Sequence, residues 1–298
     1  MTGVRVLERV ARNAAFGVRF QDPADGTTVV PGLVVEVYRR PRPHVRTRAV
    51  MSRSGVYVAH ALPGLREFEF QDADTATLWA TATRPYRVEV RDPFARFLPF
   101  AFDADLPVRG LFTWHAPWLS PPEAIVLPGD AGSPPQFLLG RVPLFSAPTR
   151  PVPGALAVVR AHLRMLDTTQ PAAWSLLGVR IDGQPRGLGL ADADGRVAVL
   201  FPFPEPPRVS LSSPPEARND FTWLLELTAF VAPLTSPPLP VPALPDLAHV
   251  LALLDMSGAV IESIDSPSTP LRLTYRDELT VRTAGLTGAD ASFLFVTA

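Results

Sequence analysis

The sequence predicts an all-β protein in which two β-sandwiches follow one another along the chain. Short apolar runs rich in valine, leucine and phenylalanine recur at close intervals, which is typical of sandwiches and not of alternating helices and strands. The 298 residues include 35 prolines and 19 glycines, as expected where rigid turns join many short strands. In the stretch 173–204, Asp182-Gly183 and Asp192–Gly195 each separate two apolar runs. Asp-Gly is a strong hairpin signal because glycine adopts positive φ without a Cβ clash.

The first sandwich is expected within residues 1–110. Residues 1–13 carry apolar side chains at helical spacing and are expected to form a short helix or an arm. Alternation or β-branched enrichment then predicts strands at 15–20, 33–38, 55–61 and 85–90, with turns at 22–26 and 62–65. Phe68 and Phe70 are expected to point the same way. Residues 39–48 are polar and basic, so we expect a loop or an exposed edge there.

Residues 111–152 differ in character and are expected to form a packed connector. The segment is rich in proline, has few charges and carries four large aromatic side chains, Phe112, Trp114, Trp118 and Phe137. These side chains must pack on something, and a structureless loop of this length is uncommon in a compact protein. The apolar run 138–145 is expected to be a strand.

The second sandwich is expected within residues 153–298. The segment 155–166 has features of a helix, but the alternation of polar and apolar residues and the need for a first strand favour a strand. Further strands are expected at 174–181, 187–191, 196–201, 209–211, 221–231, 261–264, 271–275, 279–283 and 292–296. Trp174 and Trp223 fall within these strands and are expected in the core.

An insertion at about 232–256 interrupts the second sandwich. Residues 233–245 are dense in proline and are expected to be extended. The one short helix of the chain is expected at 246–254, because Asp246 can cap it. An apolar stripe supports the helix, with Leu247, Val250, Leu251 and Leu254 at helical spacing.

The composition excludes several classes of function. The net charge of −1 and the pI of about 6.5 give no electrostatic footprint for nucleic acid or an anionic membrane. The lack of cysteine rules out disulfides, thiolate metal sites and a cysteine nucleophile. The beginning of the chain shows no signal peptide, and no apolar run approaches the length of a transmembrane helix. We therefore expect synthesis in the cytoplasm without membrane insertion.

No pattern typical of a catalyst or a cofactor site occurs in the sequence. The five histidines lack the short spacing of metal ligands. Asp192 and Asp194 are candidate calcium ligands, but Phe203 stands where an EF-hand loop has its last glutamate, so a hairpin turn is favoured. GxSxG, SxxK and glycine-rich phosphate loops are absent. We expect no enzyme activity, cofactor or metal; a Ser-His-Asp site dispersed over the sequence is the alternative.

Two groups of residues are candidates for contacts with a ligand or partner. Trp114 and Trp118 lie four residues apart among prolines; packing in a core or between domains is favoured for them, and stacking on sugar rings is the alternative. A solvated loop is favoured for the basic run, and docking onto an acidic partner is the alternative. Its candidate contact residues are Arg39, Arg40, Arg42, Arg46 and Arg48, with Arg53 close by.

The stretch 183–196 carries a short motif, Gly-x-Pro-x-Gly-x-Gly followed by a turn that opens a new strand. Its residues are Gly183, Pro185, Gly187, Gly189, Asp192, Asp194, Gly195 and Arg196. The motif resembles that of carboxypeptidase-regulatory-like, transthyretin-like sandwich modules, and Gly32, residues 54–58 and 62–64 are similar in the first sandwich. The resemblance covers about half of the chain. It implies immunoglobulin-like or transthyretin-like folds and an accessory role as a spacer, adhesive domain or structural part.

In overall style, the segments 100–110 and 194–206 also resemble small β-rich proteins of phage-tail-like contractile injection particles. This resemblance implies other protein subunits of a large assembly as partners, and a particle that leaves the cell. We therefore expect a non-enzymatic structural or adaptor component of the baseplate, cap or fibre, which docks by β-augmentation at exposed sheet edges. A carbohydrate- or surface-binding module, with a glycan as its ligand, is the alternative.

Overall fold

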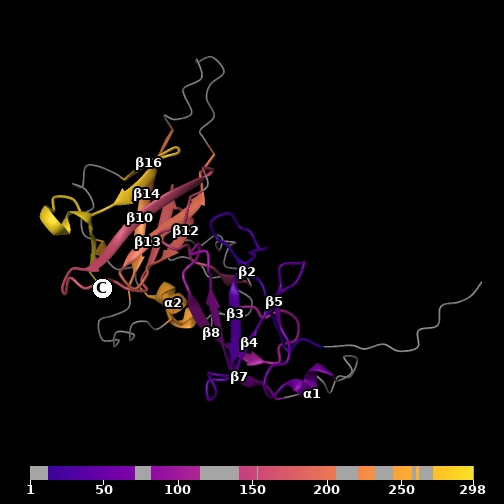
Figure 1. The fold of residues 1–298 in the computed structure, drawn as a ribbon. Coiled ribbons are helices and arrows are strands. Elements are labelled where there is room, and N and C mark those ends of the chain that lie inside the picture. Colours follow the sequence, from indigo (N-terminus) through magenta and orange to yellow (C-terminus); the bar gives the residue numbers. More distant parts are fainter. Residues whose placement is uncertain are drawn as a thin grey trace, which may run out of the picture.

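The computed structural model describes residues 13–70, 82–114, 141–152, 154–205, 221–231, 244–256, 260–261 and 271–297. They form two β-sandwiches, one from each half of the chain (Figure 1), so the all-β prediction is confirmed. None of the described helices is long and apolar enough to cross a membrane. The predictions for residues 1–12, 209–211, 233–243 and 262–264, and for Trp118 and Phe137, lie outside the described residues.

The N-terminal sandwich has two antiparallel sheets around a core rich in phenylalanine, tyrosine and valine. The larger sheet has the strand order β4 (Arg46–Arg48), β3 (Val34–Tyr38), β7 (Arg84–Arg91) and β8 (Phe100–Leu106). The smaller sheet has the order β1 (Phe16–Val18), β6 (Tyr57–Ala59) and β5 (Val50–Met51). Residues 39–48 thus form a loop and an exposed edge strand, as expected.

The described part of the connector packs on the N-terminal sandwich. Within it, β9 (Val142–Pro143) pairs in parallel with β2 (Phe20–Gln21), so a short strand lies within the range expected at 138–145, of which residues 138–140 lie outside the described residues. Phe112 packs against the N-terminal core, and its ring centroid lies 5.1 Å from that of Phe102. Phe112 therefore anchors the described part of the connector to the N-terminal sandwich.

A helical turn that alternation did not predict follows the turn at 62–65. It is α1 (Arg66–Glu69), and it leaves Phe68 buried at 3% exposure while Phe70 is 61% exposed. The expectation that these two side chains point the same way was therefore wrong. The reason is that residues two apart share a face in a strand but not in a helix.

The C-terminal sandwich also has two sheets. The first has the order β13 (Arg196–Pro202), β10 (Leu156–Met165), β18 (Leu294–Thr297) and β15 (Val260–Ile261), and β17 (Glu278–Val281) also pairs with β10. The second has the order β12 (Gln184–Leu190), β11 (Leu176–Ile181), β14 (Thr222–Phe230) and β16 (Arg272–Thr274). The described residues of this half of the chain also contain two 3-10 turns, η4 (Leu253–Asp255) and η5 (Gly288–Ser292).

The strand β10 confirms the choice of strand over helix for residues 155–166. Its residues Val159 and Leu163 enter the core, while Arg160 and Arg164 alternate with them on the outer side. The strand lies at the centre of its sheet, because β13 pairs along one edge and β17 and β18 pair in parallel along the other.

Only the first of the two expected Asp-Gly hairpins is a hairpin. Asp182 and Gly183 both have positive φ, 52° and 72°, and they join β11 to its neighbour β12. The turn Asp192–Gly195 instead leads from β12 in one sheet to β13 in the other, so the expectation of a second hairpin was wrong. A Cβ on Gly187 would lie 2.7 Å from Val199 Cγ1. The glycines of β12 thus allow β12 and β13 to pack face to face at close range.

The two tryptophans expected in strands have different environments. Trp223 lies in β14 and is 8% exposed in the C-terminal core, as expected. Trp174 precedes β11, has a positive φ of 59°, and packs against the apolar cluster of the N-terminal sandwich. The expectation that Trp174 lies in a strand was wrong, because a residue with positive φ is not extended and β11 begins only after it.

One apolar cluster joins the two sandwiches. Leu176, Leu188 and Phe230, on the outer side of their sheet, belong to the same cluster as the N-terminal core. The expected helix is present as α2 (Leu247–Ala252), which lies between the sandwiches and joins this cluster (Figure 1). Asp246 caps it as expected, since its Oδ1 accepts from Ala248 N at 2.9 Å. Phe230 therefore packs at a junction between sandwiches.

Candidate interaction face and sheet edge

Charged side chains cover the outer side of the larger N-terminal sheet. In β3, Val35 and Val37 enter the core, so Glu36 and Tyr38 point outward. The same alternation holds in the paired strands β4, β7 and β8. We call this surface the charged face, and its members are Glu36, Tyr38, Arg46, Arg48, Arg87, Glu89, Arg91, Asp103 and Asp105.

Arg46 holds the first half of the charged face together. Its Nη1 donates to Glu36 Oε2 at 2.8 Å and to Glu89 Oε2 at 2.6 Å. Its guanidinium carbon lies 4.6 Å from the ring centroid of Tyr38, and the Tyr38 hydroxyl donates to Glu89 Oε1 at 2.6 Å. These hydrogen bonds raise the pKa of Arg46 above its ordinary value. Three strands are thereby linked through one side chain.

Glu89 is ionised at the centre of this network. Its burial alone would raise the pKa of the carboxyl, but hydrogen bonds from Arg46 and Tyr38 outweigh burial, and the pKa lies below its ordinary value. The pKa of Tyr38 is raised, first by burial and then by its hydrogen bond to Glu89. The carboxylate and the neutral phenol are therefore the stable forms at neutral pH.

Protonation of the Glu89 carboxylate in acid should lower the free energy of unfolding. A carboxyl whose pKa is lower in the folded than in the unfolded chain stabilises the fold above its unfolded pKa, about 4.3, and this contribution is lost as the pH falls through the folded pKa. We expect Glu89→Gln to lower the free energy of unfolding at neutral pH by roughly 1.5–3 kcal/mol. It should also flatten the decline in acid, measured by urea unfolding at several pH values. Glu226→Gln, at an exposed position of β14, is the control; an unchanged acid profile for Glu89→Gln would contradict the assignment.

A second set of ion pairs connects the charged face to α2. Arg40 Nη2 lies 2.5 Å from Asp103 Oδ2, and Arg87 Nη1 donates to Asp103 Oδ1 at 3.3 Å. Arg87 also pairs with Asp246, the residue that caps α2. The Ala101 N–H donates to the carbonyl of Pro245 at 2.9 Å along the edge of β8. The start of α2 is therefore held at the β8 side of the sheet.

The structure separates the predicted basic run into three groups. Arg40 and Arg46 form the ion pairs described above, with carboxylates that sequence reasoning did not single out. Arg42 and Arg48 are exposed to solvent. Arg39 is half-buried, and its Nε has no hydrogen-bond partner within the described residues. The role of the run in docking remains a prediction.

One segment forms the edge of both N-terminal sheets. We call residues 46–51 the edge segment: its first part, β4, pairs with β3, and its last part, β5, pairs with β6. At the crossing, the Ala49 N–H donates to the Val35 carbonyl at 2.8 Å. Because hydrogen bonds alternate along an antiparallel pair, Arg46 and Arg48 direct their backbone N–H and C=O groups away from β3. No other strand of the described part of the chain pairs there, and Val50 is 70% exposed.

Trp114, the described member of the predicted tryptophan pair, packs on the N-terminal core. Its ring meets that of Phe102 edge-on at a centroid distance of 6.2 Å, and it is only partly exposed. Its Nε1 is buried and has no hydrogen-bond partner among the described residues. Trp118 lies outside those residues, so the structure does not test a sugar-binding role of the pair.

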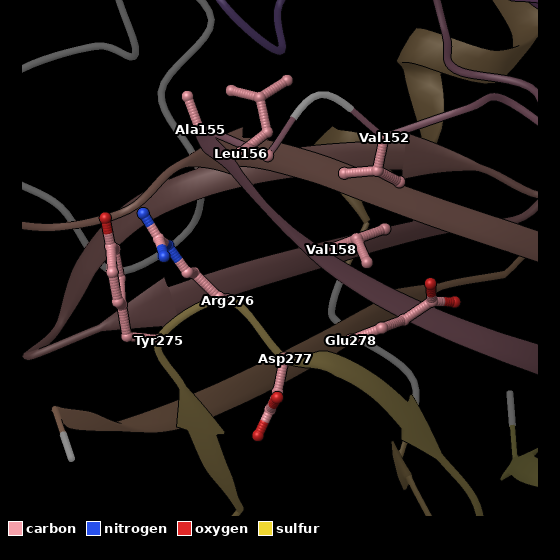
Figure 2. A pocket seen from close by; sticks show the side chains of 9 residues that line it. Val152, Ala155, Leu156, Val158, Tyr275, Arg276, Asp277 and Glu278 are labelled. Atoms are coloured by element: carbon pink, nitrogen blue, oxygen red, sulfur yellow. The ribbon is translucent and has the colours of Figure 1, made fainter. Parts of the chain in front are cut away.

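An open hollow of about 510 Å³ lies at the start of β10, beside the turn between β16 and β17. Figure 2 shows Val152 and Leu156 on one side of it, Tyr275 and Arg276 side by side, and Asp277 pointing away from them. Arg160 forms an ion pair with Glu278, another residue of its lining. The hollow has an aliphatic wall but few polar groups that point toward a common centre. Sites for small molecules combine an apolar lining with such polar groups.

Within the described ranges, no three His, Asp or Glu side chains gather as metal ligands would. Asp192, one of the two candidate calcium ligands, instead shapes its own turn. Its Oδ1 accepts from the N–H groups of Asp194 and Arg196, both at 2.9 Å. That oxygen therefore stabilises the turn between β12 and β13.

No model of a protein family and no curated protein matches the chain. Among solved structures, the chain has 8% identity to the TIE protein of Bacillus anthracis, with a TM-score of 0.22 over 90% of this chain and 33% of that one. It thus spans about a third of that protein. It has 9% identity to the shaft pilin SpaA of Lactobacillus rhamnosus GG, with a TM-score of 0.21 over 92% and 99%. TM-scores this low do not establish a common fold.

Proposed function

We propose that the protein is a non-enzymatic structural subunit that joins other protein subunits through its edge segment. The observation that carries this proposal is the row of outward-directed backbone groups at Arg46 and Arg48, on a strand that no described strand covers. An extended chain can pair with such an edge through main-chain hydrogen bonds, which is β-augmentation.

The chemistry of the edge favours an acidic partner strand. Arg42 and Arg48 are exposed beside it and would attract carboxylates. Arg46 is already held by Glu36, Glu89 and the ring of Tyr38. A strand fixed in this way loses little conformational freedom when a partner binds, and binding is correspondingly tighter.

Two finer assignments rest on resemblance alone. One is the carboxypeptidase-regulatory-like, transthyretin-like identity of the sandwiches, and the other is membership of a phage-tail-like contractile injection particle. Both belong to the proposal, since each would place the chain in an accessory structural role. Release from the cell as part of a particle likewise remains a prediction.

Photo-crosslinking in the native host tests the proposal. A photoreactive residue at Val50, on the edge, should give a discrete crosslinked product with one subunit, identified by mass spectrometry. The matched control is Leu224, which is 51% exposed on β14 of the other sandwich, and it should not give that product. Arg48→Glu should remove the product, because it places a negative charge on the edge. No product at Val50, or the same product from Leu224, would reject the edge as the docking surface.

A further inference from the structure

The two edges of the larger N-terminal sheet carry opposite charges. At one edge, β4 presents Arg46 and Arg48 on the charged face, and at the other edge β8 presents Asp103 and Asp105. Both Arg48 and Asp105 are exposed to solvent. From these two edges we propose that the partner strand at β4 is β8 of a second copy of this chain, so that copies associate head to tail. This inference rests on the proposed function and names the occupant of the edge.

At both edges, the residues that direct their backbone N–H and C=O groups out of the sheet also have their side chains on the charged face. Ala101 N–H donates outward to Pro245, so alternation directs the backbone groups of Asp103 and Asp105 outward as well. Arg46 and Arg48 direct theirs outward from β4. At both edges, therefore, the residues that can form hydrogen bonds with a new strand are those whose side chains lie on the charged face. A strand pair built from them would place the arginines and aspartates on the same side.

The strand directions also agree. Each neighbouring pair in the order β4, β3, β7, β8 is antiparallel, so β4 and β8 run in opposite directions. When the sheet of one copy continues into the next, β4 meets β8 as another antiparallel pair. Arg46 then lies opposite Asp105 of the second copy, and Arg48 lies opposite Asp103. Opposite charges in directly facing positions stabilise a strand pair.

The same charges disfavour the symmetric alternatives. Two β4 edges would place arginine opposite arginine, and two β8 edges would place aspartate opposite aspartate, which destabilises a strand pair. Only the head-to-tail arrangement joins unlike edges. Contacts of this heterologous kind form a ring if the rotation between copies closes, and an open filament otherwise. Pro245 and Asp246 meet β8 at Ala101, so the new strand pairs with β8 further along, at Asp103–Asp105.

Sedimentation velocity of the full chain over a range of concentrations tests the inference. We expect the wild type to associate reversibly, and less strongly in high salt because the charges are near the surface. Arg48→Glu and Asp105→Arg should each weaken the association constant several-fold. Arg196→Glu, at an exposed position of β13, should leave it unchanged. Urea midpoints and circular dichroism establish that each variant is folded.

Mixing the two variants decides between arrangements. Arg48→Glu retains a wild-type β8 edge and Asp105→Arg retains a wild-type β4 edge, so their mixture should form dimers with one wild-type junction that do not grow further. Stronger association of Arg48→Glu with the wild type than of the wild type with itself would indicate pairing of two β4 edges and overturn the inference. A wild type that stays monomeric at every concentration would also overturn it. The photo-crosslink at Val50 would then still report whether a different subunit occupies the edge, which separates this failure from failure of the proposed function.

Discussion

Gly195→Ala should unfold at a much lower urea concentration than the wild type. Gly195 has a φ of +84°, and a Cβ built on it would lie 2.3 Å from the carbonyl oxygen of Leu163 in β10. A side chain at positive φ costs about 1–2 kcal/mol, and overpacking adds about 1–3 kcal/mol. We therefore expect a loss of about 2–5 kcal/mol, which is a large part of the 5–15 kcal/mol typical of a folded protein.

Gly183→Ala separates the two contributions. Gly183 has a similar φ of +72°, but no heavy atom lies within 4 Å of the added Cβ. It should lose only the conformational part, about 1–2 kcal/mol. The excess loss in Gly195→Ala measures the close packing of the turn against β10. Equal losses in the two variants would show that this turn can move away from β10 at little cost.

Removal of the Asp22 carboxylate should lower the free energy of unfolding about as much as Gly195→Ala does. Arg150 Nη2 lies 2.6 Å from Asp22 Oδ2, and the two side chains are only 10% and 5% exposed. Without its partner, the guanidinium would remain buried and uncompensated, which costs about 3–5 kcal/mol. We expect Asp22→Ala to lose that amount in urea unfolding. The pair ties the turn at 22–26 to the end of the connector, so the loss should affect both segments.

A second variant tests whether charge burial is the cause. Asp22→Asn with Arg150→Met removes both charges and should recover much of the stability, because a buried ion pair can be replaced by apolar packing at small cost. The exposed pair of Asp194 and Arg196, with an N–O distance of 3.5 Å, is the control. Asp194→Ala should change the stability by less than about 1 kcal/mol. A loss in Asp22→Ala no larger than in Asp194→Ala would contradict the assignment.

The candidate site was only partly visible in the sequence. The basic run at 39–48 stands out, and its position at an exposed edge was predicted. Its partners were not, because Glu89 and Asp103 lie 43 and 63 residues from the arginines that they bind. A signal was present: charged residues alternate with apolar ones in β7 and β8, as expected of strands with one solvent-exposed face. Which charges meet depends on strand register, which no local pattern contains.

Local chemistry was sufficient for the all-β class, most strands and the capped helix. Alternation, β-branched residues and Asp-Gly turns act over a few residues, so the order of elements could be inferred from sequence. Which strands pair with one another depends on segments that lie far apart in the sequence. The turn at 192–195 shows this, because its residues permit a hairpin while Gly187 and Gly189 permit the closer packing of two sheets. Only the assembled sandwich decided between them, and only there did β4 and β8 become opposite edges of one sheet.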